Sequence, residues 1–180
     1  NVGKQGLTTP WTVALDSDGN EQTGTGILAM STLGQVTLAG AYFNQTNLND
    51  GASTGNITVG DGSEDVATAG AITTLGPVTL DAWYVDVQDI LDSYTIGAKA
   101  ATDVSGIKLG ADARWVSLTE QTDNNPATSE DNSLAKIVLT ADAGLIDGKL
   151  AYAMTDKDGG LTALDNDANT TLIGWSLNAN

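Results

Sequence analysis

Over residues 107–118 the chain reads IKLGADARWVSL, and its alternate positions differ in chemistry. One set is apolar and holds Ile107, Leu109, Ala111, Ala113 and Trp115, while the other, mostly polar, holds Lys108, Gly110, Asp112, Arg114 and Val116. Successive side chains of a β-strand point to opposite faces of a sheet. The stretch therefore predicts a strand with one apolar and one polar face.

Similar runs occur along the whole chain. The runs 78–87, 94–101 and 134–145 separate apolar from polar positions in the same way, and the run 36–44 does so more weakly. Each run is rich in Val, Thr, Ile, Tyr and Trp and is bounded by residues that form turns. Ten strands are predicted, at about 1–5, 24–33, 36–44, 65–75, 78–87, 94–101, 107–118, 134–145, 149–156 and 170–178.

The connections between these runs alternate in length. Tight turns are predicted near 34–35, 76–77, 103–106 and 146–148, and long, polar, mostly acidic loops at 45–64, 119–133 and 157–169. In an antiparallel sheet, alternate connections lie at opposite ends, so the turns gather on one rim and the loops on the other. This asymmetry, together with strands of about 9 to 11 residues, is typical of an antiparallel transmembrane β-barrel.

Composition excludes several functions. The formal net charge of -16 argues against nucleic acid as a partner, because phosphate binding needs a basic surface. With no histidine and no cysteine, a histidine-based triad or a cysteine-histidine zinc site cannot form. The mean hydropathy of -0.08 excludes a helical membrane protein but not a barrel, in which only every second residue meets lipid. No acidic pair stands out as catalytic, so no enzyme is predicted.

The charges are distributed unevenly. Six of the seven basic residues lie in or beside predicted strands, whereas most acidic residues lie in loops. Positions in the polar registers are predicted to line an aqueous pore: Lys99, Lys108, Asp112, Arg114, Lys136, Asp142 and Asp81. Alternation alone would equally suit a β-sandwich with a dry centre, which strand length and loop asymmetry disfavour.

One acidic run could hold a cation. Asp16, Asp18, Asn20 and Glu21 offer oxygen ligands of the kind that calcium prefers, although the spacing is not that of a complete EF-hand and ordinary turns are the default interpretation. The alternative function is therefore a secreted or surface-layer structural β-protein with acidic calcium-binding loops. Pairing of exposed strand edges between copies, into a fibre or sheet, is a third hypothesis.

Several short motifs resemble the major outer-membrane porins of the epsilonproteobacteria, the Campylobacter type. They include Gly3-Lys4-Gln5 followed by Pro10-Trp11-Thr12, Gly24-Thr25-Gly26-Ile27, Tyr42-Phe43-Asn44, Trp83-Tyr84, and Ala151-Tyr152-Ala153 followed by Thr155 to Gly160. The resemblance implies a barrel of about 16 to 18 strands, usually trimeric, without a cofactor, that contacts membrane lipid and lipopolysaccharide and passes ions and small hydrophilic solutes.

The resemblance also implies a constriction loop. Within residues 6–23, the segment Leu7 to Glu21 would fold into the lumen and narrow it. Ten strands are fewer than such a barrel needs, so residues 1–180 are expected to be one barrel segment, an internal portion of a longer porin. The expected location is the outer membrane of a Gram-negative bacterium.

Overall fold

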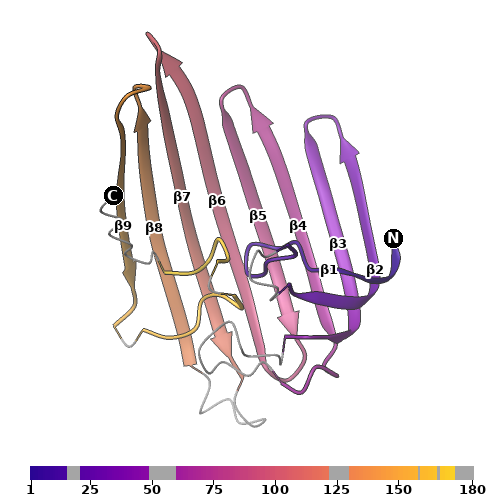
Figure 1. Cartoon of the computed structure of the whole chain (residues 1–180). Helices are drawn as coiled ribbons and strands as arrows, with labels where there is room; N and C mark the ends of the chain where they lie inside the picture. The colour runs from indigo at the N-terminus through magenta and orange to yellow at the C-terminus, as the bar shows by residue number, and fades with distance from the viewer. Residues whose placement is uncertain (16–20, 49–59, 122–129, 158, 166, 173–180) are drawn as a thin grey trace.

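The chain forms one nine-stranded antiparallel sheet in which each strand pairs with the next along the sequence (Figure 1). The computed structural model describes residues 1–15, 21–48, 60–121, 130–157, 159–165 and 167–172. The strands are β1 (Val2–Gly6), β2 (Thr23–Leu33), β3 (Val36–Thr46), β4 (Val66–Leu75), β5 (Val78–Val87), β6 (Leu91–Val104), β7 (Ile107–Glu120), β8 (Glu130–Asp142) and β9 (Asp147–Thr155).

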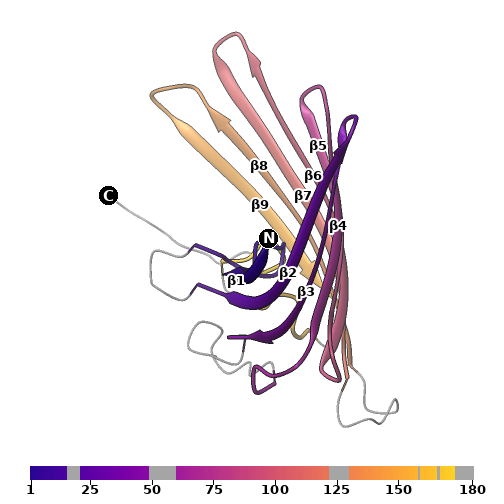
Figure 2. The same ribbon diagram turned by 90° about the vertical axis from the view of Figure 1, so that its right-hand side faces the viewer.

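The sheet is a single curved layer. Figure 2 shows that the segments following β1 and β9 lie on its concave side. We call the concave face the inner wall and the convex face the outer face. The buried core lies between the inner wall and these segments and includes Trp11, Leu91, Leu118 and Leu164.

Connections of two kinds define two rims. The turn rim carries the β2–β3, β4–β5, β6–β7 and β8–β9 connections, and the loop rim carries the others. Gly34 and Gly76 have positive φ at the first turn position, as a type II′ hairpin turn requires. Ser105 and Gly106 both have positive φ, as a type I′ turn requires. The exception on the loop rim is the β5–β6 connection, which covers only residues 88–90.

The predicted all-β antiparallel architecture is confirmed, with local corrections. The strand predicted at 94–101 is longer in the structure and extends over Leu91–Val104. Short polar residues such as Asp92 and Ser93 suggest a turn in the sequence, but here they pair with β5 within the sheet. The turn predicted at 146–148 lies at 143–146, where Gly144 supplies a positive φ. Leu145, predicted to be in a strand, is therefore in the turn. The tenth strand predicted at 170–178 lies mostly outside the described residues.

The outer face is not covered by a second layer in the described residues. Ile107, Leu109 and Ile137 are among its exposed large side chains, with 40 to 42% of their surface accessible. A β-sandwich with these residues in a dry centre is therefore not the fold.

Candidate functional site

All seven residues predicted to line a pore lie on the inner wall. Strand register places Asp81, Gly97, Arg114 and Lys136 in one row across β5 to β8. The alternation along each strand then puts the rest on the same face: Lys99 and Asp112 form one paired position, and Lys108 and Asp142 another. The structure thus brings together the residues that the sequence pattern selected, and their exposure to a pore stays a prediction.

Further charged residues share this face but were not predicted as pore-lining. Lys149 of β9 pairs in register with Thr140, and Asp147 pairs with Asp142 at the turn rim. Asp103 lies opposite Lys108 on the neighbouring strand. Their positions in the polar register are the sequence signal that would have identified them.

The inner wall is open near the turn rim, and its charges there are solvated. Lys99 Nζ lies 3.2 Å from Asp112 Oδ2, and Lys108 Nζ lies 3.9 Å from Asp142 Oδ2. The Lys108 side chain is 76% exposed. Exposed pairs of this kind contribute about 0 to 1 kcal/mol to stability, so these residues mainly set the local electric field.

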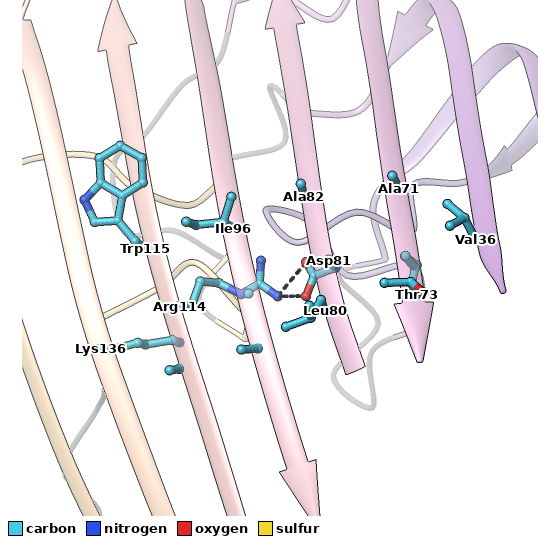
Figure 3. A pocket seen from close by; sticks show the side chains of 14 residues that line it. Val36, Ala71, Thr73, Leu80, Asp81, Ala82, Ile96, Arg114, Trp115 and Lys136 are labelled. Atoms are coloured by element: carbon cyan, nitrogen blue, oxygen red, sulfur yellow. Dashed lines mark hydrogen bonds and ion pairs between the residues drawn. The ribbon is translucent and has the colours of Figure 1, made fainter. Parts of the chain in front are cut away.

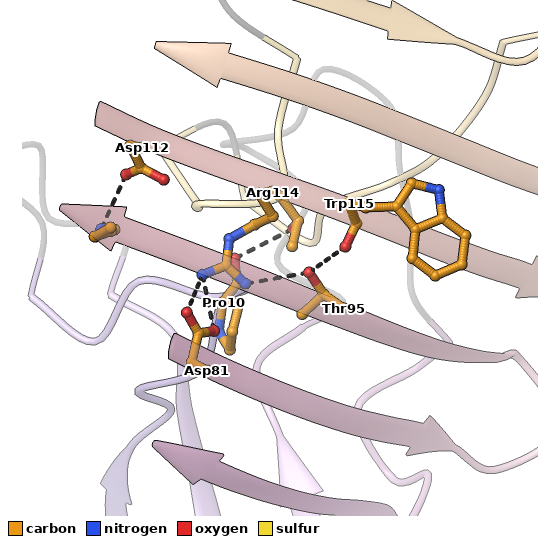
Figure 4. A network of polar contacts seen from close by, with 8 residues as sticks. Pro10, Asp81, Thr95, Asp112, Arg114 and Trp115 are labelled. Atoms are coloured by element: carbon orange, nitrogen blue, oxygen red, sulfur yellow. Dashed lines mark hydrogen bonds and ion pairs between the residues drawn. The ribbon is translucent and has the colours of Figure 1, made fainter. Parts of the chain in front are cut away.

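Arg114 is held differently from these lysines. Its Nη2 donates to both carboxylate oxygens of Asp81 at 2.8 Å, and Nη1 donates to Thr95 Oγ1 at 3.1 Å (Figure 4). Thr95 Oγ1 in turn donates to the Trp115 backbone oxygen. The side chains of Arg114 and Asp81 are only 3% and 11% exposed. The guanidinium is therefore buried in an ion pair in which one nitrogen donates to both carboxylate oxygens.

The inner wall near the loop rim is covered by two chain segments. Trp11, which is fully buried, comes from the segment after β1, and its Nε1 donates to Ser93 Oγ of β6 at 2.9 Å. The segment after β9 meets it there, because Leu164 N donates to the Trp11 backbone oxygen at 2.9 Å. Thr170 N donates to the Pro10 backbone oxygen at 3.1 Å. The two segments thus form one connected layer over this part of the wall.

Part of the covering layer leaves a hollow. A cavity of about 300 Å³ lies between Leu7–Thr9 and the inner wall of β2 to β5. Leu28, Met30, Phe43 and Trp83 line it. Its lining is apolar, in contrast to the charged wall formed by β6 to β9.

The outer face changes chemistry in steps from the loop rim. Asp86 pairs in register with Asp92, and one step further from the loop rim Tyr84 pairs with Tyr94. The Tyr94 ring packs edge-on against Trp115 with centroids 5.2 Å apart. Aliphatic and alanine side chains follow toward the turn rim. This order of acidic, aromatic and aliphatic residues is typical of a membrane interface.

A second, larger hollow lies on the outer face. Its volume is about 580 Å³, and Ala71, Ala82, Ile96 and Trp115 are among its lining residues (Figure 3). The hollow forms where the outward-facing side chains of β4 to β7 are small, because several of them are alanines. Asp81, Arg114 and Lys136 also border this hollow, but strand register directs their side chains to the opposite face.

The residues considered for calcium are mostly outside the described part of the chain. Asp16, Asp18 and Asn20 fall there, and Glu21 alone is described, so this site stays a prediction. In the described residues no group of three or more potential ligands is close enough to hold a metal ion. Likewise, none of the described segments is a helix long and apolar enough to cross a membrane.

The described part of the long β3–β4 loop is ordered by acidic side chains. Glu64 Oε2 accepts hydrogen bonds from the backbone N–H groups of Asp61 and Gly62. The hydroxyl and backbone N–H of Ser63 donate to Asp61 and lower the pKa of its carboxyl. These hydrogen bonds favour the ionised form of Asp61, which contributes negative charge to the loop rim.

No protein-family model matches the sequence, and no curated protein matches it. The fold, however, is similar to solved outer-membrane channels of Pseudomonas aeruginosa. OccK5 (OpdH) superposes with a TM-score of 0.77 at 15% identity, over 98% of this chain and 50% of that one. OpdK with vanillate gives 0.72 at 18% identity, over 86% and 43%, and OccK2 (OpdF) in complex with glucuronate gives 0.70 at 16%, over 86% and 44%.

The matched region covers half or less of each of these solved chains. At these identities the likeness establishes the fold and not the solute. The nine-stranded curved sheet is thus the counterpart of one portion of their barrel wall, and the chain has the fold of part of an outer-membrane porin barrel.

Proposed function

We propose that this chain forms part of the wall of a passive channel in a bacterial outer membrane, and that the channel passes ions and small hydrophilic solutes. The observation that carries the proposal is the opposite chemistry of the two faces. Ile137 on the outer face is apolar and exposed, while its sequence neighbour Lys136 lies on the inner wall. A closed barrel would put the first face in lipid and the second around water, the lumen.

In this proposal the two covering segments narrow the lumen. The predicted loop 6–23 contributes Leu7 and Trp11, both buried against the inner wall. The segment after β9 contributes Leu164 and Thr170, which hydrogen bond to it. Solutes would then pass beside this layer and along the open, charged wall near the turn rim.

Two lysines of the inner wall, Lys136 and Lys149, support a preference for anionic solutes. Lys136 Nζ donates to a backbone oxygen rather than to a carboxylate. Lys149 is exposed one strand further on. The structures of OpdK and OccK2 were solved with vanillate and glucuronate, which are both carboxylates. Small organic anions are therefore the solute class we propose to test first.

The remaining sequence-based assignments belong to the same proposal. They are a parent barrel of about 16 to 18 strands, a trimeric state, contact with lipid and lipopolysaccharide, and membership of the epsilonproteobacterial porins. The short motifs around Gly3-Lys4-Gln5 and Tyr42-Phe43-Asn44 support the last point.

Two single-cysteine variants at adjacent positions test the proposed channel. The 180-residue chain contains no cysteine, so Val138→Cys on the inner wall and Ile137→Cys on the outer face are unique labels within it. In planar bilayers, a charged, water-soluble thiol reagent should lower the conductance of the Val138→Cys protein. The Ile137→Cys protein should not respond, because its thiol lies in lipid.

Equal reaction of both thiols would contradict a lipid-facing outer surface. If the protein also stayed monodisperse without detergent and melted at a higher temperature with calcium, the secreted structural β-protein would replace the channel as the favoured function.

A further inference from the structure

Two cations lie directly opposite each other on the inner wall. Arg114 of β7 pairs in register with Lys136 of β8. Like charges directly opposite in an antiparallel pair destabilise it. The two side chains therefore diverge: Lys136 Nζ donates to the Thr171 backbone oxygen at 3.0 Å, whereas Arg114 crosses β6 to reach Asp81 on β5.

The path of Arg114 across β6 exists because residue 97 is glycine. Gly97 is the register partner of Asp81 on one side and of Arg114 on the other. A Cβ atom built on Gly97 would lie 2.2 Å from Arg114 Nη2 and 2.4 Å from Asp81 Oδ2. Contacts this short do not occur, so a side chain at position 97 would force the ends of the Arg114 and Asp81 side chains to move away from β6.

The arrangement removes one charge from the surface of the wall. The Arg114 side chain is only 3% exposed, against 48% for Lys99 on the adjacent strand. Thr95 accepts a further hydrogen bond from the guanidinium (Figure 4). Lys136, which is half-buried, thus remains as the more accessible cation of this row.

We propose that Gly97 and Asp81 are positioning residues that hold Arg114 flat against β6 and keep its charge out of the lumen. The assignment of a lumen rests on the proposed channel function. The specificity consequence is that Lys136, and not Arg114, acts on solutes at this level of the wall.

Arg114 is the only arginine in the 180 residues, which allows a direct test. The complete protein in detergent micelles is treated with phenylglyoxal, a reagent that modifies accessible guanidinium groups, and is then digested with trypsin. Modification blocks cleavage after Arg114, so the uncut peptide 109–136 measures the labelled fraction by mass spectrometry. Gly97→Ala and Asp81→Asn should each raise the labelling rate roughly tenfold or more, the factor expected for losing a charge-assisted hydrogen bond.

Two matched variants control for general loosening. Gly110→Ala crowds the same wall, since a Cβ there would lie 2.4 Å from Thr140 Oγ1, but it does not touch Arg114. Asp112→Asn removes a carboxylate whose partner is Lys99. Both should label as slowly as the unmodified sequence. Unchanged labelling in Gly97→Ala and Asp81→Asn, or a rise in all four variants, would overturn the proposal; Asp81→Asn alone decides if Gly97→Ala does not fold.

Reversal potentials test the electrical consequence separately. Gly97→Ala carries no charge of its own, so a shift toward anions would report the displaced guanidinium, while Gly110→Ala should leave the potential unchanged. Faster labelling without a shift would refute the claim about the lumen charge. A wild-type protein that forms no channel would refute the proposed function, and the labelling result would still decide the role of Gly97.

Discussion

The two halves of the inner wall are built by the same strands and differ completely in environment. Toward the loop rim, Val116 and Leu118 of β7 are fully buried under the covering segments. Toward the turn rim, Lys108 of the same strand and the same face is mostly exposed. One strand therefore changes from a dry packing surface to a solvated charged surface within a few residues, and Arg114 marks the boundary.

This difference teaches that period-2 alternation assigns a residue to a face and not to an environment. Substitutions in the loop-rim half, which we call the covered half, should mainly change the free energy of unfolding. Substitutions in the turn-rim half, which we call the open half, should mainly change the ion preference of the channel.

The largest effect is expected from Trp11→Ala. It removes a fully buried ring and the hydrogen bond to Ser93, and should lower the free energy of unfolding by about 3 to 5 kcal/mol. Urea unfolding followed by circular dichroism measures this change. Trp115→Ala on the outer face is the control and should cost clearly less, because that ring is 37% exposed. Equal losses would mean that the covered half is not a packed core.

A smaller effect is expected at the boundary. Arg114→Met leaves Asp81 partly buried without its partner and should cost about 3 kcal/mol. Lys99→Met, in the open half, breaks an exposed pair and should cost less than about 1 kcal/mol. The same unfolding assay compares the two. A cost for Lys99→Met that matches that of Arg114→Met would remove the distinction between the halves.

The smallest effect on stability is expected in the open half itself. Lys108→Gln combined with Lys149→Gln should shift the reversal potential toward cations and change the unfolding free energy by less than about 1 kcal/mol. Lys4→Gln on the edge strand β1 is the control, because it removes one positive charge, as each single substitution of the double variant does. An unchanged reversal potential in the double variant would show that these lysines do not act on permeating ions.

Much of the fold could be predicted from the sequence because its signals are local. The alternation in 107–116 assigned the residues of that run to the faces on which the structure places them. Gly34 and Gly76 identified turns whose positive φ the structure confirms. Errors occurred where the local signal ended, as at 143–146, where Leu145 continued an apolar register into a turn.

The environment of the site could not be predicted, since it depends on contacts between distant segments. Thr170 and Pro10 are 160 positions apart, yet their hydrogen bonds help to cover the wall. The sequence likewise gave no reason to separate Arg114 from Lys108, which occupy the same register. The gap at Gly97 and the acceptors Asp81 and Thr95 surround Arg114, whereas Lys108 lies on the open wall.

The stepwise outer face has a consequence for placement. In a bilayer, a shift of the sheet in one direction would draw Asp86 and Asp92 into hydrocarbon, and the opposite shift would lift Tyr84 and Tyr94 away from the lipid headgroups. Both displacements cost free energy, so these two neighbouring cross-strand pairs would fix the depth of the sheet in the membrane. In the proposed channel they would hold the wall at one height and keep its loop rim above the lipid surface.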